Sequence, residues 1–216
     1  MPSAQFLGDP LEGIAPTGHL EWWESQSKNA TSETQRQNIE KNREILSTFA
    51  KAFRPHYYVS CWHMNALESA KMWRCYTHNR EAVTIATSFR ALRACLPVYV
   101  EIGMIRYIDY TNERLPSLNM FEYITHKNIN YCFEREVRAV AFPPATEGVG
   151  GAHFRDNLFE SEKQNGFLVF APEVDIVNLI HRVVLHPESP PEFAEAIHSV
   201  CADVGLPEPS RSAFSQ

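Results

Sequence analysis

Two glutamates, Glu134 and Glu136, have the residue type and spacing best suited to chemistry in this sequence. They lie in the stretch 131–142, whose alternating first half and apolar second half predict one long β-strand. Residues i and i+2 of a strand point to the same side, so the two glutamates would share a face and Arg135 would lie on the other. Neighbouring carboxylates in a poorly solvated setting repel, which raises the pKa of one of them. The pair suits general acid–base catalysis or the binding of a sugar hydroxyl.

The same pattern also has a purely structural interpretation. Arg135, Arg138 or nearby lysines would pair with the glutamates along an edge strand and hold them charged. Such ion pairs perturb pKa values without any catalytic role. The sequence leaves both interpretations open.

A second group of candidate residues is aromatic. Trp62 ends a short aromatic and β-branched strand, while Trp73 and Tyr76 are three apart on one face of an expected helix. This spacing is typical of core packing, and the alternative is a flat wall on which a nicotinamide or a base stacks. His63, next to the strand, is a weaker site candidate, since a lone histidine is more often at the surface or satisfied in a core.

Composition limits the classes of function. The net charge of −6 gives no basic footprint for a nucleic-acid backbone, and no apolar run is long enough to span a membrane. The five cysteines have no C-x-x-C spacing, so we expect a reduced, cytoplasmic protein without a zinc site or disulfide framework. The length and the 44% hydrophobic content suit a single domain, 1–216, with a loop at 1–20 and a flexible tail at 207–216.

Short strands separated by irregularly placed helices predict an α+β fold with a mixed, largely antiparallel sheet. We expect strands at 57–62, 82–87, 131–142, 166–170 and 183–185. Residues 98–103 and 104–110 would form one long strand or two strands joined at Gly103. We expect helices at 33–53, 65–76, 88–96, 120–127, 174–179 and 190–204, and a glycine-rich flap at 143–156.

The turn Gly8-Asp9-Pro10, followed by Glu12, carries two carboxylates. A solvated turn is the simpler interpretation. The alternative is metal binding, in which Asp9 and Glu12 would join Glu134 and Glu136 around Mg²⁺ or Mn²⁺ in a nuclease.

Several segments, taken in order, resemble a bacterial family of unknown function, domain-of-unknown-function family 2971, whose genes sometimes lie beside phage-defence genes. The resemblance covers roughly residues 6–200 and rests on Phe6–Gly13, Val59–Trp62, Glu68–Tyr76, Val83–Thr87, Tyr107–Tyr110 and Lys127–Arg138. That family looks like a distant relative of the NAD-consuming ADP-ribosyltransferases. Its members usually carry a further strand and helix before the Gly-Asp-Pro loop, and this sequence begins where that segment would end.

The resemblance implies a site and a substrate. NAD would be the candidate substrate, Glu136 the catalytic carboxylate, Glu134 its partner, and Ser60 on the middle strand a residue that orients Glu136. Trp73 and Tyr76 would form the nicotinamide wall. The candidate binding residues are therefore Ser60, Trp62, Trp73, Tyr76 and Arg138.

The leading hypothesis is an NAD- or nucleotide-handling enzyme of ADP-ribosyltransferase-like architecture, acting as a toxin or phage-defence effector. The alternatives are a non-catalytic domain that binds a ligand or partner, and the metal-dependent nuclease.

Overall fold

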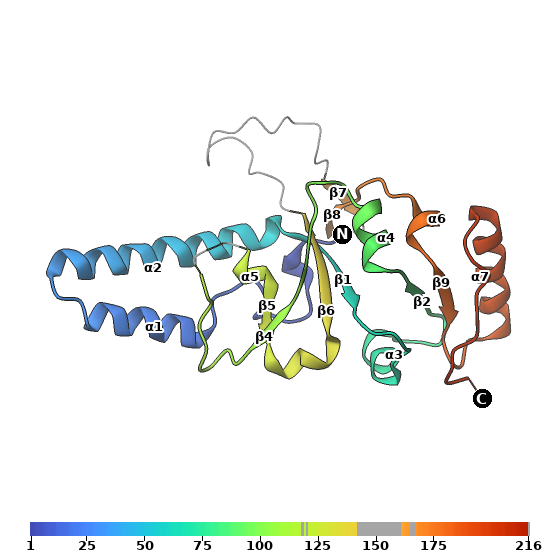
Figure 1. Cartoon of the computed structure of the whole chain (residues 1–216), viewed down its shortest axis with the longest axis horizontal. Helices are drawn as coiled ribbons and strands as arrows, with labels where there is room; N and C mark the ends of the chain where they lie inside the picture. The colour runs from blue at the N-terminus through green and yellow to red at the C-terminus, as the bar shows by residue number, and fades with distance from the viewer. Residues whose placement is uncertain (118, 120, 142–160, 165–166, 216) are drawn as a thin grey trace. The chain divides into compact units, whose positions relative to one another are not determined.

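The computed structural model of the chain describes residues 1–117, 119, 121–141, 161–164 and 167–215. Helices and short, mostly antiparallel strands give the α+β class that the sequence predicts (Figure 1). Within these ranges, no helix is long and apolar enough to cross a membrane.

The helices and strands are mostly short. The helical segments are η1 (Ala4–Phe6), α1 (Thr17–Lys28), α2 (Glu33–Phe53), η2 (Arg54–His56), α3 (Ala70–Tyr76), α4 (Phe89–Cys95), α5 (Glu122–Thr125), η3 (Ile129–Glu134), α6 (Ile176–Leu179) and α7 (Pro191–Val204), where η marks a 3₁₀ turn. The strands are β1 (Tyr58–His63), β2 (Val83–Ala86), β3 (Glu101–Met104), β4 (Arg106–Ile108), β5 (His126–Asn128), β6 (Glu136–Ala141), β7 (Ser161–Gln164), β8 (Phe167–Phe170) and β9 (Arg182–Leu185).

The chain groups into two compact units. Unit 1 comprises Met1–Met64 and Tyr99–Ala171, and unit 2 comprises Asn65–Val98 and Pro172–Gln216. The chain leaves unit 1 after β1 and returns to it before β3. Each unit is therefore built from two separate parts of the sequence, a division that composition does not encode.

In unit 1 the strand order is β1–β6–β3, with β6 in the middle and both pairings antiparallel. The first residues of the chain extend this sheet, since Ser3 bridges Tyr58 and Pro2 bridges Val169. Residues 1–3, expected as loop, are therefore held by strand-like pairing on both sides.

The helical hairpin α1–α2 belongs to unit 1 (Figure 1). Ser32 caps α2, accepting from Gln35 N–H at 3.1 Å. Helix α1, in contrast, begins inside the segment that was expected to be loop. The sequence did not predict this helix because its buried residues Gly18, His19 and Trp23 give little apolar periodicity. A Cβ on Gly18 would lie 2.7 Å from the carbonyl oxygen of Glu113, so the helix packs closely on that loop.

Two clusters of buried apolar side chains form the core of unit 1. One consists of Ala4, Tyr57, Val59, Ile124 and Val140. The other consists of Ala50, Ile108, Tyr110, Leu115 and Tyr123. The polar cluster described below lies on the loop before α1, β5, η3 and β6 of the same unit.

Unit 2 contains the antiparallel pair β2–β9 and the helices α3, α4, α6 and α7. Helix α7 starts at Pro191, as predicted, and ends at Gly205, whose φ of 73° suits glycine. The segment 207–216, expected to be a flexible tail, contacts the rest of unit 2: Ser210 forms a β-bridge with Val184, and Ser212 donates a hydrogen bond to Glu68.

The stretch 131–142 is not one strand. It opens with the 3₁₀ turn η3, passes through Arg135 in the left-handed region (φ 42°), and becomes β6 only at Glu136. Strand β4 is also separate, breaking from β3 at Ile105 rather than at Gly103 and pairing in parallel with β5. The flap expected at 143–156 lies outside the described residues, as does Phe142.

Candidate functional site: a buried charge cluster

Glu134 and Glu136 do converge, although not because they alternate on a strand. Glu134 ends η3 and Glu136 begins β6, and the left-handed residue Arg135 turns the chain between them. The carboxylate oxygens of Glu134 and Glu136 lie 2.6 and 3.6 Å from the ammonium nitrogen of Lys127. The turn at Arg135 therefore brings both carboxylates to the ammonium group of Lys127.

Lys127, on β5, is the centre of the cluster. Its Nζ also lies 3.1 Å from Oε1 of Glu12, so three carboxylates contact one ammonium group. Burial alone would lower the pKa of Lys127. The hydrogen bond that Lys127 donates to Glu134, together with the charges of the carboxylates, raises this pKa above its ordinary value. Lys127 is therefore a fixed positive charge.

Arg138, on β6, is the second cation and is only 1% exposed. Its Nε and Nη2 donate to the two oxygens of Glu136 at 2.6 and 2.9 Å. Nη2 also donates to Glu12 at 3.0 Å, and Nη1 donates to the carbonyl of Ile124 at 2.9 Å. This paired geometry is the strong form of an arginine–carboxylate contact.

The cluster keeps Glu136 charged. Burial would raise the pKa of Glu136, but Arg138, the Cys61 thiol and Lys127 together hold it below its ordinary value. Among the described residues, Glu12, Glu134 and Glu136 contact the two cations Lys127 and Arg138. An ionised carboxylate held in place in this way can stabilise a positively charged ligand or transition state.

Cys61 lies beside this carboxylate on β1. Cys61 pairs with Arg138 in the β1–β6 register, so its side chain lies on the face of the sheet that carries Glu136. Removal of water from around the sulfur raises the pKa of the Cys61 thiol to about 12, with Glu136 adding to this effect and the charge of Arg138 opposing it. Cys61 is therefore a protonated thiol and not a thiolate nucleophile.

His63 is the titratable residue directly opposite Glu136 in the β1–β6 register, so the two side chains share a face of the sheet. Its Nδ1 lies 2.6 Å from the carbonyl oxygen of Glu134, and a carbonyl only accepts, so Nδ1 carries the proton. Its Nε2 is buried and has no hydrogen-bond partner among the described residues. That nitrogen has a lone pair available to take a proton.

Ser60 and Trp62 do not belong to this face. They pair with Ala139 and Val137, so their side chains lie on the side of the sheet opposite to Glu136. Trp62 Nε1 donates to Ser60 Oγ at 3.0 Å. The register thus gives no support to Ser60 as the residue that orients Glu136, and its strand β1 lies beside the middle strand β6.

Trp73 and Tyr76 belong to unit 2. The Trp73 ring is buried, packs edge-on against His186 with centroids 5.3 Å apart, and donates from Nε1 to Glu68 at 3.3 Å. Tyr76 is 58% exposed. For Trp73 these contacts match the core interpretation that the sequence left open.

Sequence reasoning did not single out Lys127, and it placed Glu12 beside Glu134 and Glu136 only in the nuclease alternative, around a metal ion. Glu12 was expected on a solvated turn but is 1% exposed. Asp9 is also buried, and its Oδ1 accepts from Leu11 N–H at 2.9 Å without joining the cluster. A lone glutamate before a glycine carries no pattern that indicates burial, so the sequence offered no signal for Glu12.

The arrangement also bears on the nuclease alternative. Within the ranges that the structure describes, no group of three or more His, Cys, Asp or Glu side chains is arranged to hold a metal ion. The carboxylates of Glu12, Glu134 and Glu136 meet instead around Lys127, whose ammonium group takes the place that a metal ion would need.

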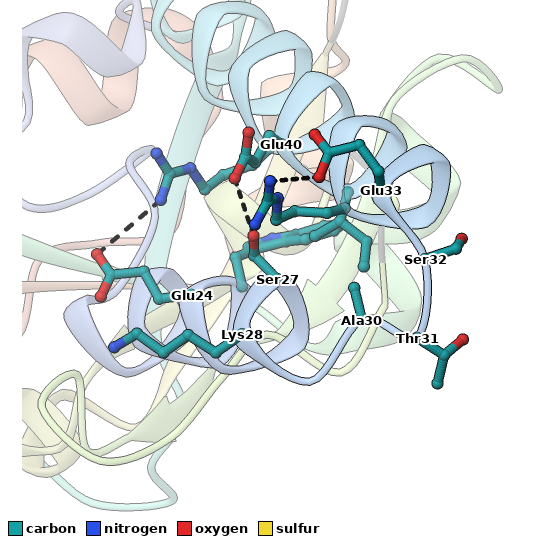
Figure 2. A pocket seen from close by; sticks show the side chains of 12 residues that line it. Glu24, Ser27, Lys28, Ala30, Thr31, Ser32, Glu33 and Glu40 are labelled. Atoms are coloured by element: carbon teal, nitrogen blue, oxygen red, sulfur yellow. Dashed lines mark hydrogen bonds and ion pairs between the residues drawn. The ribbon is translucent and has the colours of Figure 1, made fainter.

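The helical hairpin of unit 1 encloses a hollow of about 590 Å³ between α1 and α2 (Figure 2). Its polar groups pair with one another. Across the hairpin, Ser27 donates to Glu40 at 2.9 Å and Arg43 pairs with Glu24 at 3.9 Å, while Arg36 pairs with Glu33 within α2. These internal pairs leave little reason to place a ligand there.

Searches against protein-family models, curated proteins and solved structures give no match for this chain. The site is therefore interpreted from its own geometry.

The lowered pKa of Glu136 makes stability depend on pH in a defined window. A carboxyl whose folded pKa is depressed stabilises the fold above its unfolded pKa, about 4.3, and loses that contribution as pH falls through the folded value. We expect urea unfolding of the wild type to show a stability loss below about pH 4.3 that is smaller in Glu136→Gln. Identical pH profiles for the two proteins would contradict the lowered pKa.

Proposed function

We propose that this protein is an NAD- or nucleotide-handling enzyme that breaks an N-glycosidic bond, with Glu136 as the carboxylate that stabilises the transition state. The observation that carries the proposal is the buried carboxylate of Glu136, whose pKa Arg138 and Lys127 help to hold below its ordinary value. A role as a toxin or phage-defence effector is part of the same proposal and rests on the family resemblance.

The chemistry suits such a site. When the bond between the ribose carbon and the nicotinamide nitrogen breaks, the electron pair leaves with nicotinamide and the ribose becomes an oxocarbenium-like cation. A carboxylate already held charged by Arg138 and Lys127 stabilises that cation without reorganising.

His63 supplies the remaining group. Water or an acceptor hydroxyl attacks the ribose carbon and must lose a proton. The free lone pair of His63 Nε2, on the same face as Glu136, is positioned to accept it.

The test is release of nicotinamide from NAD by the full chain. We expect Glu136→Gln to lower the rate by at least about 100-fold, the usual effect of removing one group that stabilises a transition-state charge. Glu101→Gln is the matched control, because Glu101 is exposed on β3 of the same sheet and contacts none of the cluster. Circular dichroism at the assay temperature establishes that each variant is folded.

Equal rates for wild type and Glu136→Gln, or no turnover by wild type, would refute the proposed enzymatic activity.

A second candidate function is a non-catalytic ligand-binding domain. It is favoured by one observation: both Glu136 oxygens already accept from Arg138, and Glu136 is only 5% exposed. Tight binding of NAD or ADP-ribose in calorimetry, without turnover, would support that candidate.

A further inference from the structure

Unit 2 has a hollow of its own, about 480 Å³, formed by α3, the segment that follows it, residues 186–188 and the C-terminal tail. All its lining residues belong to unit 2. The volume falls in the range of small-molecule sites. The lining residues that matter chemically are Trp73, Arg74, His78, Arg80, His186 and Phe214.

The aromatic part of the hollow is held in place by Glu68. Glu68 accepts from Trp73 Nε1 at 3.3 Å, from Ser212 Oγ at 2.5 Å and from Ala213 N–H at 3.0 Å. It thereby ties the C-terminal tail to α3 and positions Phe214, which is 44% exposed, at the hollow. A flat apolar ring can pack there against Phe214 and the edge of Trp73.

His186 faces the hollow with a defined tautomer. Its Nδ1 accepts from Glu188 N–H at 3.1 Å, so in the neutral ring the proton is on Nε2. The ring is half-buried against Trp73. His186 therefore presents an N–H donor from a position fixed by packing.

The cations exceed the anions in this hollow. Arg80 pairs with Glu188 at 2.9 Å, but both side chains are more than 60% exposed, so the pair is weak and exchangeable. Arg74 and His78 have no hydrogen-bond or ion-pair partner within the described part of the chain. Two guanidinium groups thus face one carboxylate, and one guanidinium is unpaired.

We propose that this hollow binds a mononucleotide, with the phosphate on Arg74, Arg80 and His186 and the base against Phe214 and Trp73. Arginine forks match phosphate oxygens in geometry and charge. The proposal is independent of the function proposed for Glu136, because no residue of the charge cluster lines this hollow.

The test is calorimetry of the full chain with adenosine monophosphate, adenosine and inorganic phosphate. We expect saturable binding of the nucleotide, at least about tenfold weaker binding of adenosine and of phosphate alone, and a loss of at least about tenfold in Arg74→Glu. Arg90→Glu is the matched control: Arg90 is exposed in unit 2 and does not line the hollow. Glu136→Gln should bind the nucleotide as wild type does, whatever its effect on NAD turnover.

Three results would overturn the proposal. They are the absence of saturable binding by wild type, equal affinity for adenosine and its monophosphate, and equal affinities of Arg74→Glu and Arg90→Glu.

Discussion

Replacing Arg138 by methionine is expected to lower the free energy of unfolding by about 3–5 kcal/mol, the usual effect of removing one partner from a buried ion pair. Arg138 donates to both oxygens of Glu136, to Glu12 and to the carbonyl of Ile124. Methionine fills much of the same space but leaves all of these acceptors without their donor. Urea unfolding at pH 7, followed by circular dichroism, measures the change.

The matched control is Arg106→Met, which removes an exposed arginine from β4 of the same unit and should change stability by no more than about 0.5 kcal/mol. If Arg138→Met is too unstable to purify, Arg138→Lys keeps the charge and loses the paired geometry, and it should show an intermediate loss. An Arg138→Met protein as stable as the control would show that Arg138 does not compensate the carboxylates.

Replacing Lys127 by methionine should lower the free energy of unfolding by a similar amount, about 3–5 kcal/mol at pH 7. The pH dependence of this loss should be opposite to the pH dependence that Glu136 gives the wild type. Without the ammonium group, Glu134 loses its ion pair with Lys127, and Glu12 and Glu136 keep their contacts with Arg138. The remaining repulsion among the three carboxylates should raise the pKa of one of them. A group with a raised folded pKa contributes most below its unfolded pKa and loses that contribution as pH rises. The Lys127→Met deficit should therefore be smaller at pH 5 than at pH 8.

Lys41→Met serves as the control for that experiment, since Lys41 is exposed on α2 and no ion pair involving it occurs within the described residues. A deficit in Lys127→Met that is the same at pH 5 and pH 8 would contradict the coupling among the three carboxylates.

Local signals predicted the local structure well. Helices α2, α4 and α7 lie close to their expected ranges, because residues at their N-termini favour a helix start: Ser32 caps α2, Ser88 caps α4 and Pro191 opens α7. The short strand β1 follows from its aromatic and β-branched run. These features depend on neighbours in the sequence, which a reader of the sequence can see.

The long-range features were not predictable in the same way. Glu12 and Arg138 are 126 positions apart, and nothing in the residues near Glu12 indicates that it is buried against an arginine. The interpretation of Glu134 failed for a local reason, because an alternating pattern over 131–136 suits a strand as well as a 3₁₀ turn ended by a left-handed residue. The sequence allowed Glu136 to pair with Arg135 or with Arg138. The structure contains the pair with Arg138 and, among the described residues, none with Arg135.

The site combines a structural role with a chemical one. Arg138 and Lys127 hold the carboxylate of Glu136 in place, and its negative charge can stabilise a cation. Both roles require Glu136 to be ionised at neutral pH.

The most direct test is a ¹³C NMR titration of the side-chain carboxyl of Glu136, whose resonance is assigned by its absence in Glu136→Gln. We expect a midpoint below the ordinary glutamate value of about 4.3, because Arg138, Cys61 and Lys127 outweigh the effect of burial. A midpoint above that value would contradict the charged cluster, and a midpoint near neutrality would leave Glu136 protonated and unable to stabilise a cation.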